Sequence, residues 1–272
     1  MKYLKPIALI VLVIAAVVVL YVIMTQELKA DYVVEEGVLL SCETNATSLS
    51  VPSFIEGQKI TKIGNRAFSN NSSLLNVKLP DGVTHIMKEA FFNCDKLREI
   101  DLSETVGFIE PEAFLNCPDL TKINVHFDNQ ILGSFNGVLF NSSYTYLKYF
   151  PTGYERVEFY VPTGTMIIEE KAFAHCLLEN VFLPDTVIRI DNYAFEDCRN
   201  MKSITLPPRL NSLGEGAFIK CNKLTSITIS DGVEIMDNVV GNDSFKQQYL
   251  TYGAGTYIKV SNDKWEFYKK AE

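Results

Sequence analysis

The clearest pattern of apolar and polar positions in this chain is a unit of about 23 residues that occurs six times. Each unit has an Ala-Phe pair, with an aliphatic residue four positions before the alanine. The pairs are Ala67-Phe68, Ala90-Phe91, Ala113-Phe114, Ala172-Phe173, Ala194-Phe195 and Ala217-Phe218. A fixed period of about 20–50 residues is typical of solenoids, in which each unit buries its apolar face against the next one. The pattern therefore predicts a stack of coils.

A short alternating segment follows each pair and predicts a β-strand. In the first unit Val77 and Leu79 alternate with Asn76 and Lys78, which is the period of a strand buried on one face. Proline or serine closes most of these segments, and proline ends a strand because it cannot donate to the ladder. The Ala-Phe stretch itself is too short for a regular helix, so we expect one helical or 3₁₀ turn there, with the phenylalanines stacked in a spine.

The cysteines follow the same repeat. Five of the six stand three positions after a repeat phenylalanine, where the first unit has Asn71 instead. The side chains of equivalent positions in stacked coils point the same way, which opposes disulfide formation. We therefore expect reduced, buried thiols that bond nearby carbonyl groups, and we expect Cys42 to lie in a strand of the N-terminal cap.

The repeat is interrupted once. Phe114 and Phe173 are 59 residues apart, and we expect an inserted β-hairpin at about residues 126–162, with strands at 137–140 and 146–150. The repeat strand restarts at Val157 in this interpretation, and the repeats as a whole span residues 51–236.

The two ends of the repeat predict caps, which solenoids need to cover their terminal coils. Residues 25–50 form a linker and an N-terminal cap, with a hairpin at 32–40. Val240-Gly241 replaces the next Ala-Phe pair, so the repeat stops and a C-terminal cap occupies residues 237–272. In that cap we expect a short helix from Asp243 to Tyr252 and a closing hairpin at 256–268.

A second pattern lies at the N-terminus, where Ile7 to Met24 form 18 consecutive apolar residues without a charge. A helix of this length comes close to the roughly 30 Å of a bilayer's hydrocarbon core. Lys2 and Lys5 precede it, which favours residues 1–6 in the cytoplasm and the rest of the chain outside. The run is long for a signal peptide and Leu28-x-Ala30 is a poor cleavage site, so we expect a retained signal-anchor at residues 7–24; secretion after cleavage is the alternative.

Composition narrows the range of partners. The chain has 272 residues, of which 47% are apolar, a formal charge of −8 and a pI near 5.1. This acidic balance excludes a general affinity for nucleic acid phosphates.

The repeating unit resembles that of the BspA-type leucine-rich-repeat family of bacterial surface proteins, whose unit reads approximately V-x-x-I-G-x-x-A-F-x-x-C-x-x-L-x-x-I-x-L-P. The resemblance covers roughly residues 32–236. It implies an α/β, β-rich leucine-rich-repeat solenoid, a right-handed horseshoe of six repeats with an inserted hairpin. It also implies display at the cell surface, binding to an extracellular protein or glycan, and no catalysis.

The outward positions of the predicted strands are the candidate binding residues. They comprise Asn76, Lys78, Glu99, Asp101, Lys122, Asn124, Asn180 and Phe182, to which the tyrosine-rich hairpin adds Tyr144 and Tyr146. Most are ordinary solvated polar residues. Phe182 differs, because an aromatic side chain on the exposed side of a strand favours a partner, unless the hairpin folds over it.

Motifs for chemistry do not emerge from the sequence. The three histidines form no metal-ligand spacing, and the adjacent His175 and Cys176 are expected to point in different directions. We expect no catalytic residue, no metal and no cofactor. Two functions other than adhesion to an extracellular ligand stay open: an envelope-internal scaffold or polysaccharide-binding module, and a structural spacer. A surface enzyme would need polar groups clustered in a pocket, and the sequence offers none.

Overall fold

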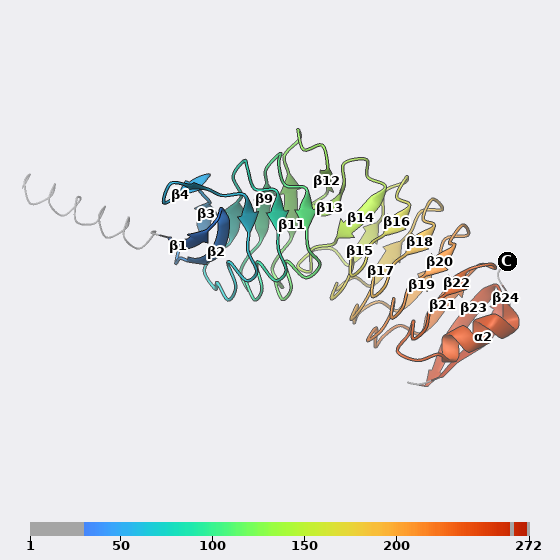
Figure 1. Ribbon diagram of the computed structural model, residues 1–272. Helices are drawn as coiled ribbons and strands as arrows, with labels where there is room; N and C mark the ends of the chain where they lie inside the picture. The colour runs from blue at the N-terminus through green and yellow to red at the C-terminus, as the bar shows by residue number, and fades with distance from the viewer. Residues whose placement is uncertain (1–29, 262–263, 271–272) are drawn as a thin grey trace, which may run out of the picture.

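The structure is a computed structural model that describes residues 30–261 and 264–270. Within them the chain forms a β-rich solenoid of about nine turns, with the coils stacked from one end of an elongated body to the other (Figure 1). The proposed anchor at Ile7–Met24 lies outside the described residues. None of the helices that the structure describes is long and apolar enough to cross a membrane. The anchor therefore stays a prediction.

Two stacks of strands run along the solenoid, because each regular coil contributes one longer and one shorter strand. We call the stack of longer strands the long-strand side. It begins with β3 (Ser48–Ser50), which the sequence pattern does not indicate, and continues with the predicted alternating segments: β7 (Asn76–Lys78), β9 (Glu99–Leu102), β11 (Lys122–Val125), β15 (Glu158–Tyr160), β17 (Asn180–Phe182), β19 (Ser203–Thr205) and β21 (Ser226–Ile229). The other stack is the short-strand side: β2 (Val38–Glu43), β6 (Lys62–Ile63), β8 (His85–Ile86), β10 (Phe108–Ile109), β14 (Tyr146–Tyr149), β16 (Ile167–Ile168), β18 (Arg189–Ile190), β20 (Ser212–Leu213) and β22 (Glu234–Ile235).

The expected hairpins and the short helix lie at the two ends of the solenoid, but β2 and β3 already belong to the strand stacks, so the coils begin before residue 51. At the N-terminal end β1 (Asp31–Glu35) forms an antiparallel hairpin with β2, which holds Cys42 and pairs in parallel with β6. A small hairpin of β4 (Phe54–Ile55) and β5 (Gln58–Lys59) follows. At the C-terminal end the helix α2 (Ser244–Tyr252) buries Phe245 and Tyr249, and the hairpin of β23 (Gly255–Ser261) and β24 (Lys264–Lys270) closes the long-strand side.

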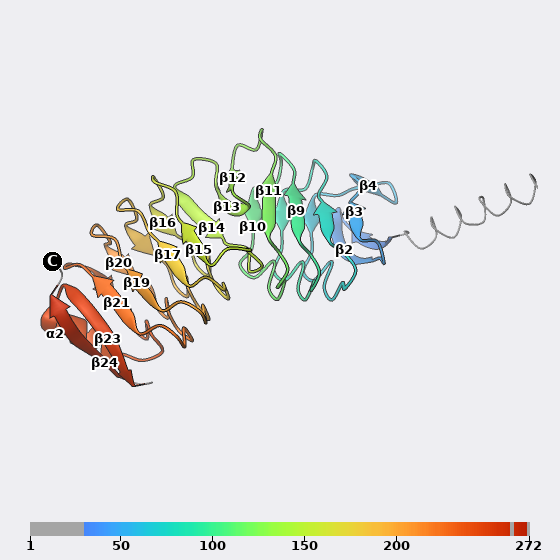
Figure 2. The same ribbon diagram turned by 180° about the vertical axis from the view of Figure 1, so that it is seen from behind.

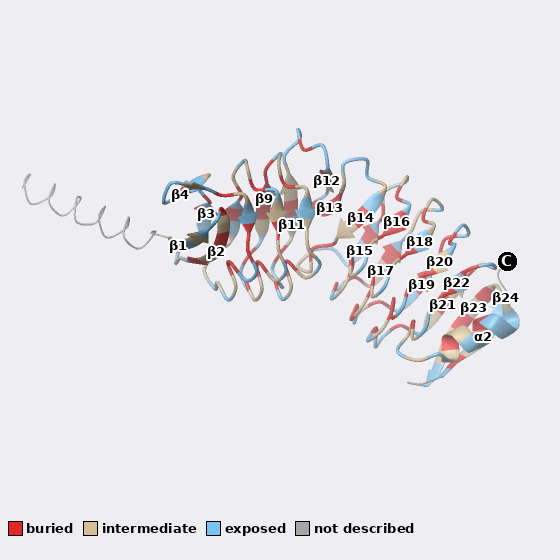
Figure 3. Cartoon of the chain, viewed as in Figure 1, coloured by how far each residue is buried: buried red, intermediate tan, exposed pale blue. Residues whose placement is uncertain are grey.

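The core is the predicted spine of phenylalanines. The ring centroids of Phe173 and Phe195 lie 4.8 Å apart, and those of Phe195 and Phe218 lie 5.2 Å apart. Each ring is fully buried, and every repeat phenylalanine except Phe114, which precedes the insertion, donates its N–H to the carbonyl of the alanine, or its replacement, in the next coil. Inward and outward positions alternate along the strands (Figure 3). Stacking is thus the interaction that buries each unit.

The connection around each Ala-Phe pair differs from the sequence prediction. It is a series of tight turns, not a helical or 3₁₀ turn. The reason is that each connection has two residues with positive φ, such as Arg66 and Asn70 in the first unit. A left-handed residue breaks the right-handed repetition that a helix needs. Asparagine tolerates this conformation, and Asn70, Asn93 and Asn116 form a ladder of side-chain hydrogen bonds of 3.0 Å.

All six cysteines are free and buried, as predicted. Four thiols donate to the carbonyl of a phenylalanine in the preceding coil, for example Cys221 to Phe195 at 3.0 Å. The Asn71 amide bonds the Thr44 carbonyl in the same way, also at 3.0 Å. Among the five cysteines of the repeat, Cys176 is the exception, because its Sγ lies 3.0 Å from the Sγ of Cys198 instead.

The insertion divides the solenoid, and we call the region where both strand stacks are interrupted the junction. The predicted hairpin contains a third strand, so that β12 (Leu132–Phe135), β13 (Val138–Asn141) and β14 form an antiparallel meander. The sequence prediction missed β12, because its Leu-Gly-Ser-Phe segment lacks an alternating pattern. Two separate buried clusters meet here. Figures 1 and 2 show the meander between the two halves.

The insertion also extends the repeat. Phe150 takes the place of a repeat phenylalanine, since its N–H donates to the Ala172 carbonyl and its ring lies 4.9 Å from that of Phe173. The end of the repeat shifts by one residue: the Phe218 N–H donates to Val239, so Val239-Val240 and not Val240-Gly241 occupies the last Ala-Phe position.

Candidate functional site

The outward residues of the long-strand side form two ladders across β7, β9 and β11. Asn76, Glu99 and Lys122 occupy equivalent positions, and Lys78, Asp101 and Asn124 occupy the next outward positions. The Lys122 ammonium donates to Glu99 at 3.0 Å, and this hydrogen bond raises the pKa of Lys122. The Asn124 amide donates to Asp101 at 2.8 Å. The structure therefore places these six predicted residues on one polar surface.

A hollow of about 850 Å³ opens where this surface meets the junction. Asn76, Glu99 and Lys122 line it from the first half. From the insertion it is lined by Asn136, Tyr154, Glu155 and Arg156. Arg156 comes two residues before β15, so the hollow connects the surface of β11 with that of the second half.

An exposed aromatic pair lies on the second half of the same side. Phe182 of β17 is 42% exposed, and Tyr160 of the neighbouring β15 is 65% exposed. Their ring centroids are 4.3 Å apart with an interplanar angle of 13°. The Asn180 amide donates to Glu158 at 3.0 Å beside them. The exposed Phe182 ring therefore stacks on the Tyr160 ring of the restarted repeat strand, and both rings stay open to solvent.

Tyr144 and Tyr146 do not join this surface. Tyr146 lies in β14 and pairs with Ile167, so it belongs to the short-strand side. Tyr144 occupies the turn between β13 and β14, with positive φ, and its ring lies 5.8 Å from that of Phe140. The structure therefore brings eight of the ten candidate residues to the long-strand side, and it places Tyr146 on the other stack and Tyr144 in the turn before it.

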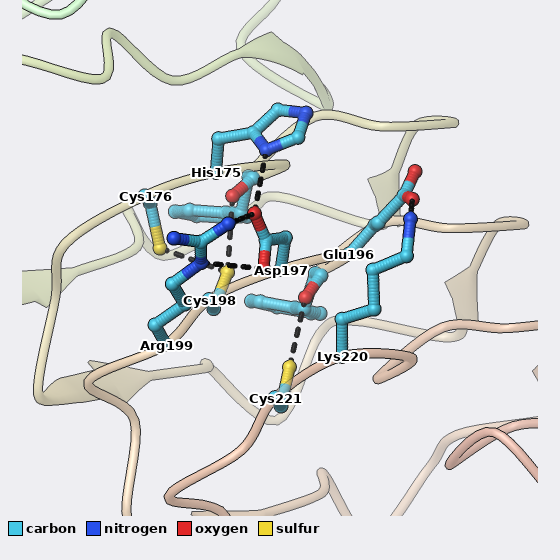
Figure 4. A network of polar contacts seen from close by, with 10 residues as sticks. His175, Cys176, Glu196, Asp197, Cys198, Arg199, Lys220 and Cys221 are labelled. Carbon is cyan, nitrogen blue, oxygen red and sulfur yellow. Dashed lines mark hydrogen bonds and ion pairs between the residues drawn. The ribbon is translucent and has the colours of Figure 1, made fainter.

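His175 and Cys176 point apart, as expected from their sequence (Figure 4). Cys176 is in the core against Cys198, whereas the His175 ring lies at the surface with Nδ1 3.1 Å from an Asp197 carboxylate oxygen. Arg199 donates to both Asp197 oxygens, at 2.8 and 2.9 Å. Arg199 first, and His175 in addition, lower the pKa of Asp197 below its ordinary value of 3.8.

The Asp197 carboxylate makes a pH-dependent contribution to the free energy of unfolding. Because its pKa is depressed in the folded protein, the contribution is present above about pH 4 and is lost as the pH falls through the lowered value. We expect Asp197→Asn to lower the free energy of unfolding by about 1 kcal/mol at pH 7, since the guanidinium of Arg199 is largely exposed. At pH 2 the difference from the natural chain should be smaller. Urea unfolding at both pH values measures this, and an equal difference at both would contradict it.

One group of possible metal ligands comes together in the described part of the chain: Glu104, His126 and Asp128, with ligand atoms within 4.8 Å of one another. All three are exposed, and the His126 ring stacks on exposed Phe127. This is an ordinary charged surface, and we assign no metal to it.

Comparison with known proteins identifies the repeat. A profile of the BspA type leucine rich repeat region matches six copies, over residues 41–155 and 166–252, which is most of the chain. The chain belongs to the BspA type leucine-rich-repeat family. A search of curated protein sequences found no match.

Solved structures of bacterial proteins resemble this chain to different degrees. A leucine-rich repeat protein from Eubacterium ventriosum has 16% identity and a TM-score of 0.54, over 76% of this chain and 71% of that one. A leucine rich cell surface protein from Faecalibacterium prausnitzii has 21% identity and a TM-score of 0.44, over 78% of this chain and 84% of that one. The first likeness shows that the BspA type repeats here adopt the leucine-rich-repeat fold.

Sequence reasoning missed Tyr160 and the residues of the junction that line the hollow. Tyr160 falls inside the insertion expected at about residues 126–162, near the restart of the repeat strand. The restarted repeat strand does indicate that Tyr160 faces outward, because Tyr160 lies between the inward residues Phe159 and Val161. No sequence pattern indicates that Asn136 and Arg156 line the hollow, because their positions depend on how the insertion folds against β11.

Proposed function

We propose that this chain is a membrane-anchored, surface-displayed binding protein that recognises an extracellular protein or glycan through its long-strand side and catalyses no reaction. The observation that carries the proposal is the exposed pair of Tyr160 and Phe182. An exposed aromatic pair beside the carboxylate of Glu158 and the amide of Asn180 offers a ligand both an apolar platform and hydrogen bonds. Rigid, repeated strands hold these groups in fixed positions.

The surface around the pair supports recognition over a larger area. The hollow beside Lys122 and the ladders of β7, β9 and β11 continue from the pair along one side of the solenoid. Recognition sites of proteins combine a central aromatic contact with a polar rim in this way. The anchor rests on the sequence of Ile7–Met24, and the two lysines before it favour display of the solenoid outside the membrane.

Display is tested on protoplasts that produce the full chain with a C-terminal epitope tag. We expect the tag to be removed by added protease while the cells stay intact, and the chain to stay with the membrane after an alkaline carbonate wash. Protection of the tag would contradict the orientation, and release by carbonate or recovery of the chain in the medium would contradict the anchor.

Binding is tested with the full chain in zwitterionic nanodiscs, screened against immobilised extracellular-matrix proteins, mucin-type glycans and bacterial envelope polysaccharides. We expect saturable binding to a matrix protein or a mucin-type glycan. Binding to envelope polysaccharide alone would instead support an envelope-internal scaffold, and binding to none of them would support a structural spacer.

A further inference from the structure

A second cavity lies at the junction, among residues of the short-strand side. It has a volume of about 620 Å³, which is within the range of about 300–1,000 Å³ that ligand sites occupy. Apolar side chains from both halves of the solenoid line it: Phe108, Ile109, Phe114, Leu132, Leu139 and Tyr149. The cavity exists because β10 ends the short-strand stack of the first half and the stack that contains β12 and β14 begins separately. None of the ten candidate residues lines it.

Charged side chains surround this apolar surface, and negative charge is in excess. Six carboxylates and three basic side chains line the cavity. Each basic side chain is already paired: Lys171 with Glu112, Lys148 with Glu169, and Arg189 with Asp191. The first of these pairs joins the two halves across the junction, and the Lys171 ammonium lowers the pKa of Glu112, so that this carboxylate stays ionised.

Two of the remaining carboxylates have no cationic partner. Glu196 pairs with Lys220, but neither Glu110 nor Glu170 takes part in an ion pair among the described residues. Glu110 accepts a hydrogen bond of 2.8 Å from the backbone N–H of Lys88, and Glu170 is exposed. The cavity therefore combines an apolar surface with two uncompensated negative charges on its rim.

We propose that this cavity binds a basic segment of a partner protein, with an apolar side chain of the segment inside and neighbouring lysine or arginine side chains at Glu110 and Glu170. An acidic segment would be repelled by the rim. A neutral sugar could donate hydroxyl groups to these carboxylates, but it carries no positive charge to compensate the two negative charges on the rim. The site is separate from the long-strand side and stands independently of the function proposed above.

The test uses the full chain in zwitterionic nanodiscs and a fluorescein-labelled Lys-Leu-Lys-Phe-Lys peptide, with Glu-Leu-Glu-Phe-Glu as the comparison and empty nanodiscs as the blank. Fluorescence anisotropy should show saturable binding of the basic peptide alone, weaker at higher salt because the contacts are between charges. We expect Glu110→Gln with Glu170→Gln to weaken binding at least tenfold. Phe108→Ala should weaken it severalfold, and since Phe108 is 51% exposed the variant should fold normally.

Matched controls distinguish binding of the basic peptide in the cavity from its general attraction to an acidic protein. Glu104→Gln with Glu234→Gln removes the same charge at exposed positions elsewhere, and Phe54→Ala removes another exposed ring. These controls, and Tyr160→Ala with Phe182→Ala, should bind the basic peptide as the natural chain does. The proposal is overturned if no peptide binds, if both peptides bind equally, or if the two glutamine pairs reduce binding to the same extent.

Discussion

Replacing Phe195 with alanine is expected to lower the free energy of unfolding by about 3–5 kcal/mol, a cost typical of removing a fully buried phenylalanine ring. Phe195 lies within the spine, with stacked rings 4.8 Å away on one side and 5.2 Å on the other. Its removal leaves a void between two coils that the hydrogen bonds of the turns hold at a fixed spacing, so the coils cannot close it.

Urea unfolding followed by circular dichroism measures this cost, with Phe54→Ala as the control. Phe54 is 61% exposed and makes no contact in the spine, so its replacement should change stability by less than about 0.5 kcal/mol. Amide hydrogen exchange adds a second readout: because the core consists of two clusters, protection should fall in β16–β22 more than in β6–β10. An equal loss of unfolding free energy in the two variants would contradict the stabilising role of the phenylalanine spine.

Replacing Gly153 with alanine is expected to lower the free energy of unfolding by about 2–3 kcal/mol, because it places a methyl group between the two halves. A Cβ at this position would lie 2.6 Å from the backbone carbon of Asp119 and 2.7 Å from the Pro118 carbonyl oxygen. The Gly153 N–H also donates to the Leu120 carbonyl at 2.8 Å, one of the hydrogen bonds across the junction. Backbone atoms cannot turn aside as a flexible side chain can, so the halves must move apart.

Gly57→Ala is the matched control for this variant. Gly57 has a φ of +77° and no atom within 4 Å of its would-be Cβ, so the substitution costs only the strain of a left-handed alanine, about 1 kcal/mol. Urea unfolding of both variants compares the two costs. Because Gly153 lines the hollow beside Lys122, its replacement should also change the shape of that site. A cost for Gly153→Ala no greater than that of the control would contradict the close approach at the junction.

The repeated part of the fold could be predicted from the sequence because stacking gives the same position the same environment in every coil. The phenylalanine spine, the buried thiols and the outward ladders all follow from the recurrence of Ala-Phe and of the alternating segment. Asn71 illustrates the strength of this argument, since its amide makes the carbonyl bond that the cysteines make elsewhere.

The junction could not be predicted, because nothing in it recurs. β12 has no periodic pattern, and the place of Phe150 in the spine depends on a hydrogen bond to Ala172 that no local signal indicates. The two cavities are consequences of how the insertion lies against the first half. For the same reason the sequence does not separate Tyr144 and Tyr146 from the strand surface, since a hairpin pattern does not show which stack the hairpin extends.

The central claim is that the exposed pair of Tyr160 and Phe182 forms the binding site, and it is tested most directly by titrating the ligand from the screen onto the full chain and onto Tyr160→Ala with Phe182→Ala. Tyr252→Ala with Phe54→Ala is the control, because it removes two exposed rings at the ends of the solenoid. We predict a loss of affinity of at least tenfold, about 1.4 kcal/mol or more, for the first variant and no change for the control. Undiminished affinity of the first variant would contradict the account.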